Sequence, residues 1–193
     1  MKYLHISYVA ALTLISGCTG APVKYNFTST RLDTPTRITS SVKGVETGAF
    51  SYNSPGELGQ FKASSLGCIP CRNNGTTPGI TFAQPIHEIV KQEFNNSLSE
   101  ALLPSNSTPC MVNGIIHMAA HNIMSGDQTL DITYIITTNE IAKYKKRIKV
   151  TNPSSLFGGL PLDRIFQKAT QKSVEELLAD TDFRTTITKS CQA

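Results

Sequence analysis

Residues 130–150 read LDITYIITTNEIAKYKKRIKV and contain two strands joined by a turn. In the first strand Leu130, Ile132, Tyr134 and Ile136 alternate with Asp131, Thr133, Ile135 and Thr137. Alternation with a period of two residues is typical of a strand that buries one face. The stretch therefore predicts an antiparallel hairpin with one buried face and one open face.

The second strand of this hairpin carries a run of positive charge. Its apolar positions are Ala142, Tyr144, Ile148 and Val150, and its other positions are Lys143, Lys145, Arg147 and Lys149. Lys146 is the one exception on the apolar side. A three-residue turn, Thr138-Asn139-Glu140, would place Tyr134 opposite Tyr144 and Asp131 opposite Arg147. The four basic residues are candidates for contact with an anionic surface: phosphate headgroups, lipopolysaccharide or an acidic partner. The competing interpretation is a solvated strand whose lysines discourage edge pairing.

Helical and extended segments surround the hairpin. Apolar residues recur at helical spacing over 85–103 and again over about 162–181, which predicts two helices. Further strands are expected over 38–50, interrupted by Gly44 and Gly48, and over 110–124. Residues 51–84 are rich in Pro and Gly and predict a long loop, which is unusual inside a compact domain. The expected fold is α+β: a four-stranded, largely antiparallel sheet with two helices on one face.

The composition fits one domain, which we place at residues 38–193. The chain has 193 residues, of which 39% are hydrophobic and 17% charged. These values exclude collagen-like, disordered and multi-span membrane proteins.

The first residues predict export. Lys2 is followed by a mostly apolar segment, Tyr3–Ile15, that is too short to span a bilayer. Leu14-Ile15-Ser16-Gly17-Cys18 resembles a bacterial lipobox, which implies that residues 1–17 are a signal peptide and that Cys18 carries the lipid. The alternative is an ordinary secretory signal in which Cys18 is not modified. Removal of residues 1–17 leaves 17 basic and 14 acidic residues, a formal charge of +3.

A lipid on Cys18 would determine where the protein is found. A diacylglycerol and an amide-linked acyl chain such as palmitate anchor a protein stably. Thr19 stands where retained inner-membrane lipoproteins carry Asp, so resemblance to enterobacterial sorting implies the outer membrane, facing the periplasm. Residues 18–37 are expected to be a tether.

Four further cysteines are expected to form two disulfides in an oxidising compartment. They are Cys68, Cys71, Cys110 and Cys191. Three connectivities are possible, and we predict that one of Cys68 and Cys71 pairs with Cys110 and the other with Cys191. Cys68-Ile69-Pro70-Cys71 also has the spacing of a thiol-disulfide oxidoreductase, but no flanking strand and helix are predicted. A zinc site would need a second close pair of cysteines.

The remaining candidates favour neither metal binding nor catalysis. His117 and His121 fall on a predicted strand, where four residues span roughly 13 Å, too far for a shared metal ion. His87, near the start of the first helix, has no predicted partner. No phosphate loop, Gly-x-Ser-x-Gly elbow or His-Glu-x-x-His motif occurs. We therefore predict no catalytic residue, metal or cofactor, and the lack of Trp and of RNA-binding aromatic motifs disfavours nucleic acid.

The second half of the chain is similar to the YajG-type small envelope lipoproteins and, more loosely, to auxiliary lipoproteins of lipid-transport ABC systems. The similarity covers residues 110–187 in pattern and 38–104 in element order. It is carried by the lipobox, the helix end Leu98–Leu103, the strand Val112–Met124, the segment Asp131–Tyr134 with Tyr144, and the closing helix Glu175–Phe183. The long cysteine-bearing loop departs from the pattern. The resemblance implies a non-enzymatic envelope module.

The sequence thus predicts a membrane-anchored, non-catalytic binding or scaffold lipoprotein whose partner is another envelope protein. It identifies no small-molecule ligand. Two alternatives stay open: a periplasmic thiol-disulfide oxidoreductase using Cys68 and Cys71, and an auxiliary component of a lipid transport or assembly system. Lipid carriage would require an apolar cavity between sheet and helices.

Overall fold

The computed structural model describes Lys24, Phe27, residues 45–53, 62–63, 82–101, 110–121 and 127–153, Arg164, and residues 166–191. Its elements, in chain order, are β1 (Glu46–Tyr52), β2 (Lys62–Ala63), α2 (Ile86–Ala101), β3 (Cys110–His121), β4 (Gln128–Thr138), β5 (Ile141–Asn152), α3 (Gln167–Ala179) and α4 (Thr181–Ser190). Within this part of the chain no helix is long and apolar enough to cross a membrane.

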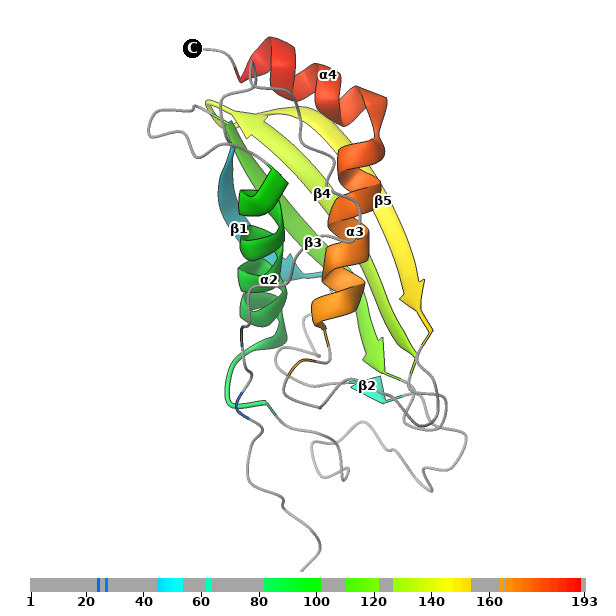
Figure 1. The fold of residues 1–193 in the computed structure, drawn as a ribbon. Helices are drawn as coiled ribbons and strands as arrows, with labels where there is room; N and C mark the ends of the chain where they lie inside the picture. Colours follow the sequence, from blue (N-terminus) through cyan, green and yellow to red (C-terminus); the bar gives the residue numbers. More distant parts are fainter. Residues whose placement is uncertain are drawn as a thin grey trace, which may run out of the picture.

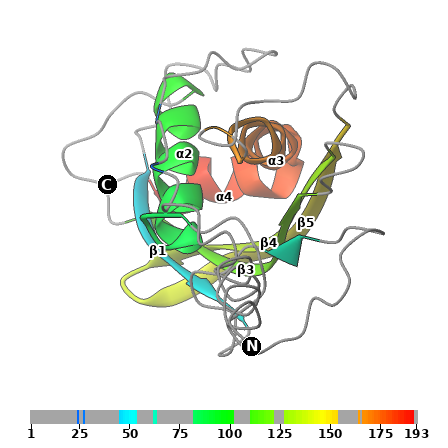
Figure 2. The ribbon, with the colours of Figure 1, turned by 90° about the horizontal axis from the view of Figure 1, so that it is seen from below.

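The four long strands form one sheet in the order β1-β3-β4-β5, with short β2 beside β3 (Figure 1). β3, β4 and β5 are antiparallel neighbours, whereas β1 and β2 run parallel to β3. The sheet curves around the helices, which all lie on its concave side (Figure 2). The predicted α+β fold with a largely antiparallel sheet is therefore confirmed.

The core lies between the concave side of the sheet and the helices. The apolar side chains of β4 that face the helices are completely buried: Leu130, Ile132, Tyr134 and Ile136. Phe94 of α2 stacks on Tyr134, with ring centroids 5.2 Å apart. Phe50 of β1 lies against Gly114 of β3, where an added Cβ would come within 2.6 Å of the Phe50 ring. Full burial of a phenylalanine side chain stabilises a fold by about 1.5–3 kcal/mol.

The helix predicted over about 162–181 is observed as α3, which begins later, at Gln167, but the sequence did not predict the third helix, α4, that follows Asp180. Helix α3 ends at Ala179, and Asp180 adopts an extended backbone with ψ of 123°. Its carboxylate accepts a hydrogen bond of 2.8 Å from the Phe183 amide, which caps α4. The new helix buries Phe183 against Tyr144, with ring centroids 5.5 Å apart.

The predicted register of the hairpin is also wrong. The turn has two central residues, Asn139 and Glu140, with positive φ angles of 49° and 66°. This turn is typical of hairpins, and Asn tolerates the left-handed conformation that it requires. A bulge near Lys143 then shifts the pairing. As a result Tyr134 lies opposite Lys146 rather than Tyr144. The bulge supplies the odd residue, so each side chain stays on its predicted face.

Several predicted boundaries differ from the observed ones. β1 extends to Tyr52 and β2 lies at Lys62–Ala63, so the segment 51–84 contains extended structure that its Pro and Gly content did not predict. β3 and α2 are observed only as far as His121 and Ala101. The predicted signal peptide 1–17, most of the tether 18–37, and Cys18, Cys68 and Cys71 lie outside the described residues.

Candidate binding surface on the convex face of the sheet

The convex face of the sheet carries the alternate side chains of the hairpin that the sequence predicted to be open. Those of β5 are exposed, whereas Asp131 and Thr133 of β4 are buried. Register places the side chains of this face in rows across the strands. Lys145 lies beside Ile135 and Asn113, Arg147 beside Thr133 and Ile115, and Lys149 beside Asp131 and Met118. All positive charge in these rows belongs to β5. We call Lys145, Arg147 and Lys149 the β5 column; all three are exposed.

Arg147 is held by Asp131 in a two-point ion pair. Its Nε lies 2.7 Å from Oδ1 and its Nη2 lies 2.8 Å from Oδ2 of the carboxylate. Hydrogen bonding to Arg147 holds the pKa of Asp131 below its usual range, although burial of the carboxylate opposes this shift. The predicted ion pair is confirmed, but the two residues are not direct neighbours as predicted, because Asp131 lies opposite Lys149 and Arg147 opposite Thr133. The ion pair forms along the diagonal of the ladder.

The other two members of the β5 column enter no ion pair within the described part of the chain, and neither does Lys143. Lys143, the fourth predicted member of the basic run, is exposed at the bulge. Arg147 is therefore fixed by its partner, whereas Lys145 and Lys149 present charges that a ligand could neutralise.

The structure explains why Lys146 interrupts the apolar positions of β5. This lysine projects on the helix side of the sheet and forms an ion pair with Asp180, the residue that separates α3 from α4. Burial works against ionisation of this acid, but the Lys146 ammonium and the Phe183 amide hold the pKa of Asp180 below its usual range. The charge of Lys146 thus stabilises the concave side and is not part of the convex surface.

A hydrogen-bonded network orders the middle of the convex face. His117 Nε2 lies 2.8 Å from Thr133 Oγ1, and His117 Nδ1 lies 3.2 Å from Asn53 Nδ2. Because Asn53 donates to Nδ1, the proton of the neutral ring is on Nε2, which donates to Thr133. Nε2 thus cannot act as a base toward the Thr133 hydroxyl. The arrangement fixes side chains and is not a nucleophile–base pair.

The histidines form no metal site in the described residues. His117 and His121 are on β3, as predicted, and no group of three metal-ligating side chains occurs in the segments the structure describes. His87 lies on the first turn of α2, with Nε2 at 3.5 Å from the Glu88 carboxylate. It had no predicted partner because a contact between sequence neighbours leaves no signal in the periodicity.

Apolar side chains adjoin the β5 column on the same face. Ile115 and Ile135 are partly exposed, and Met111 is 39% exposed. Asn113 lies among them and is held at both ends: its amide nitrogen donates to Thr137 Oγ1 at 3.0 Å, and its oxygen accepts from the Ala49 amide at 2.9 Å. The convex face thus combines ordered polar groups, a partly apolar centre and cationic side chains along β5.

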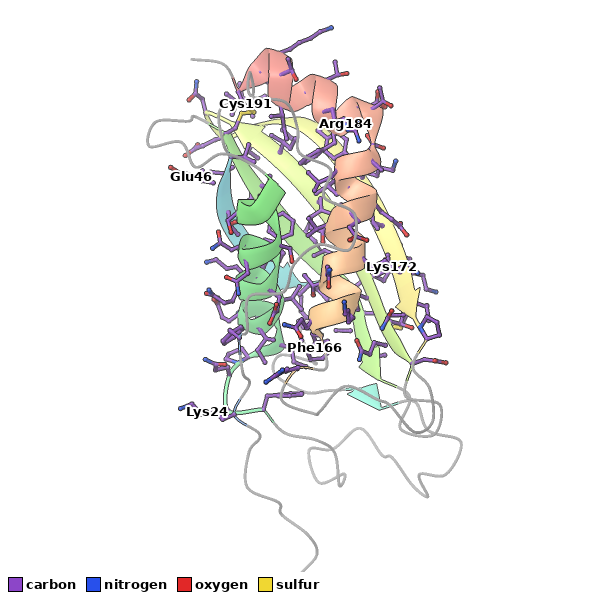
Figure 3. The ribbon with its side chains drawn as sticks, in the orientation of Figure 1. Lys24, Glu46, Phe166, Lys172, Arg184 and Cys191 are labelled. Atoms are coloured by element: carbon purple, nitrogen blue, oxygen red, sulfur yellow. A yellow bond between two sulfur atoms is a disulfide. The ribbon has the colours of Figure 1, made fainter. Side chains whose placement is uncertain are left out.

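A disulfide joins Cys110 to Cys191, with the Cα atoms 5.4 Å apart. The predicted pairing of each with Cys68 or Cys71 is therefore wrong. β3 begins and α4 ends at the same end of the molecule, which brings the two cysteines together (Figure 3). A separation of 81 residues gave no signal in the sequence, because this proximity depends on the turn of the chain at Asp180.

Comparisons with known proteins give structural similarity only. No family model and no curated protein matches the chain. A DUF330 protein from Xanthomonas campestris matches with 10% identity and a TM-score of 0.48, over 87% of this chain and 97% of that one. An uncharacterized protein matches with 11% identity and a TM-score of 0.45, over 88% and 99%. A protein from Caulobacter crescentus described as "a putative lipoprotein" matches with 9% identity and a TM-score of 0.37, over 53% and 83%. Similarities at this level place the chain in no family and assign it no function.

Proposed function

We propose that this protein is a lipid-anchored, non-catalytic binding module of the bacterial cell envelope. The observation that carries the proposal is the convex face of the sheet. It is free of helices within the described residues, and its β5 column is flanked by side chains held in a hydrogen-bonded network. Side chains ordered before binding lose less conformational entropy when a partner docks. Such a face is suited to contact with another envelope protein.

The lipobox at Leu14–Cys18 supports the anchor. Lys24 lies at the end of the fold opposite Cys191 (Figure 3). At about 3.3–3.6 Å per residue, the six residues from Cys18 to Lys24 reach at most about 20 Å. The anchor would therefore hold the Lys24 end near the bilayer and direct the α4 end away from it. By resemblance to enterobacterial sorting, Thr19 favours the outer membrane, facing the periplasm.

The anchor is tested by intact-mass spectrometry of the protein purified from bacterial membranes. We expect a chain that begins at Cys18 and carries three acyl groups, and we expect Cys18→Ala to abolish the modification. An unmodified chain that begins at another residue would contradict the proposal.

Binding is tested by capture of partners from envelope extracts with the acylated protein. The matched control is Lys91→Glu/Lys189→Glu, which changes the net charge as much as Lys145→Glu/Lys149→Glu does but alters the helices. We expect a partner that the control retains and the β5 variant loses. Identical capture by both variants would contradict a role for the β5 column.

Thiol-disulfide exchange is a second candidate, favoured by the observed disulfide. Because Cys110 bonds Cys191, Cys68 and Cys71 are the remaining cysteines after Cys18. Cys68 and Cys71 would therefore be available to pair with each other as a CxxC motif, because Cys110 and Cys191 are already bonded. A thiol count in mild reductant tests this candidate: two thiols that appear well before the Cys110–Cys191 bond opens would support it. Resistance of all disulfides would count against it.

The resemblance to YajG-type and ABC-transport auxiliary lipoproteins suggests service in a lipid transport or assembly system. The described interface between sheet and helices holds the packed rings of Phe50, Phe94 and Tyr134 in its interior. This packing favours a role through surface contact over carriage of a lipid inside the domain. Loss of the same partner on mutation of the β5 column would support that role.

A further inference from the structure

β5 ends the sheet and leaves one side of its main chain open. It is twelve residues long, and its only strand neighbour in the described residues is β4. One carbonyl near its end, that of Thr151, accepts a hydrogen bond of 3.2 Å from Lys172 of α3. From Tyr144, after the bulge at Lys143, to Val150 this edge therefore offers a regular row of main-chain groups that pair with no other described strand. Such an edge is a template for a further strand.

The charges beside this edge select what can pair with it. Successive members of the β5 column, which are two residues apart in sequence, lie about 6.8 Å apart along the strand. Toward the sheet centre their neighbours are Ile135, Thr133 and Asp131, which are neutral or acidic. The positive charge thus forms a line along one strand and not a broad patch. A line fits a single extended chain better than it fits a plane of lipid headgroups.

A second copy of the protein is a poor occupant of this edge. Pairing of β5 with β5 would bring lysine side chains of the two copies together, and like charges facing each other across strands are destabilising. A strand with Asp or Glu at alternate positions would instead place carboxylates beside Lys145 and Lys149. The same lysines therefore discourage self-association and favour an acidic partner.

We infer that the free edge of β5 binds an extended acidic segment of a partner protein, which adds to the sheet as a strand. The inference rests on the proposed binding function and specifies the partner's chemistry. Main-chain hydrogen bonds would supply the pairing, and the β5 column would supply selectivity for acidic side chains.

The test uses the full acylated protein in detergent and a fluorescent ten-residue peptide that alternates Thr and Glu. We expect saturable binding, measured by fluorescence anisotropy, that weakens as salt concentration rises. Lys145→Glu/Lys149→Glu should weaken binding at least tenfold, whereas Lys91→Glu/Lys189→Glu should leave it unchanged. Equal effects of the two variants would overturn the site.

Two further probes separate strand addition from charge attraction alone. A peptide that alternates Pro and Glu keeps the charge but lacks half of the main-chain donors, and it should bind at least tenfold more weakly. Hydrogen exchange of the β5 amides should slow with the Thr–Glu peptide only. Equal affinity of the two peptides would overturn strand addition, and so would binding to phosphatidylglycerol vesicles in place of the peptide.

The two proposals fail in different ways. Suppose that the β5 variant captures the same envelope partner as the wild type, and that only other convex-face mutations abolish capture. This result would overturn binding at the β5 edge and leave the binding module standing. Absence of any partner at the convex face would overturn the binding module itself.

Discussion

The two faces of β4 are built from alternate residues of one strand and are stabilised by different interactions. On the concave side Tyr134 is fully buried between α2 and α3, and its hydroxyl bonds Ser173 at 2.8 Å. On the convex side Thr133 bonds His117 at the same distance of 2.8 Å, and Asp131 holds Arg147, which is exposed. The concave face is closed by packing, whereas the convex face is ordered but keeps its charges available.

Burial of the tyrosine has a clear electrostatic consequence. Desolvation raises the pKa of Tyr134 well above its usual range, so the hydroxyl stays protonated and can serve as a hydrogen-bond donor or acceptor to Ser173. The convex face shows the reverse, because Arg147 favours the charged form of Asp131. One strand therefore carries a neutral buried hydroxyl at Tyr134 and an ionised carboxylate at Asp131, three positions apart and on opposite faces of the sheet.

The largest effect is expected when the concave side loses its covalent closure. The Cys110–Cys191 bond joins residues 81 positions apart, and closure of a loop of this length stabilises by about 4 to 5 kcal/mol on a chain-entropy model. Cys110→Ser/Cys191→Ser should lower the free energy of unfolding by that order, measured by urea denaturation. Cys68→Ser/Cys71→Ser, which spares this bond, serves as the control. Equal stability of the wild type and the first variant would contradict the clamp.

The next largest effect tests the packing of α3. Leu177 is fully buried on the concave side, and its replacement by Ala should cost about 2–5 kcal/mol of unfolding free energy. Glu176→Ala changes the exposed neighbour on the same helix and should have little effect. If the two variants unfold at the same urea concentration, α3 does not pack against the sheet as described.

Matched hydrogen-bond deletions compare the two faces directly. Tyr134→Phe leaves the Ser173 hydroxyl buried without its partner and should cost about 1–3 kcal/mol. Thr133→Val removes a bond of the same length from the convex face. Its cost should be under about 1 kcal/mol, because water can reach the partly exposed His117 ring. The comparison fails if the convex deletion proves the more costly.

The smallest expected effect is a pH dependence of stability. The folded-state pKa of Asp131 is lower than its unfolded value, so its contribution is present above about pH 4 and is lost as the pH falls through the lowered value. Asp180 acts in the same direction. Asp131→Asn should therefore flatten part of the acid limb of the unfolding curve below about pH 4. Parallel curves for wild type and variant would contradict the effect.

Periodicity predicted the faces of the fold better than its connections. The alternation around Tyr134 identified which side chains face the helices, because a one-residue slip would turn all of them to the other face. It did not predict that Asp131 and Thr133 on the convex side are buried as well. It did not predict the register, since the two-residue turn and the bulge at Lys143 together preserve the same parity as a three-residue turn. The break at Asp180 was also missed, although Asp before a new apolar series is a helix-start signal.

The candidate surface was predicted only in part, because periodicity predicts the face on which a side chain lies but not the residue that it contacts. The line of basic residues in β5 is visible in the sequence, and its exposure is confirmed. The ion pair of Arg147 with Asp131 was predicted, although from a different register. The roles of Lys146 and His117 could not be predicted, because each depends on a residue from another strand or from a helix junction. Likewise, the disulfide depends on the end of α4, which the sequence did not place.

Site-specific photo-crosslinking in the bacterial envelope tests the central claim most directly. A benzophenone side chain at position 145 probes the convex face, and the same group at position 92 probes an exposed site on α2. Mass spectrometry should identify crosslinks from position 145 to an acidic extended segment of one partner, with none to that segment from position 92. Crosslinks to that segment from position 92 alone would contradict the assignment of the convex face as the binding surface.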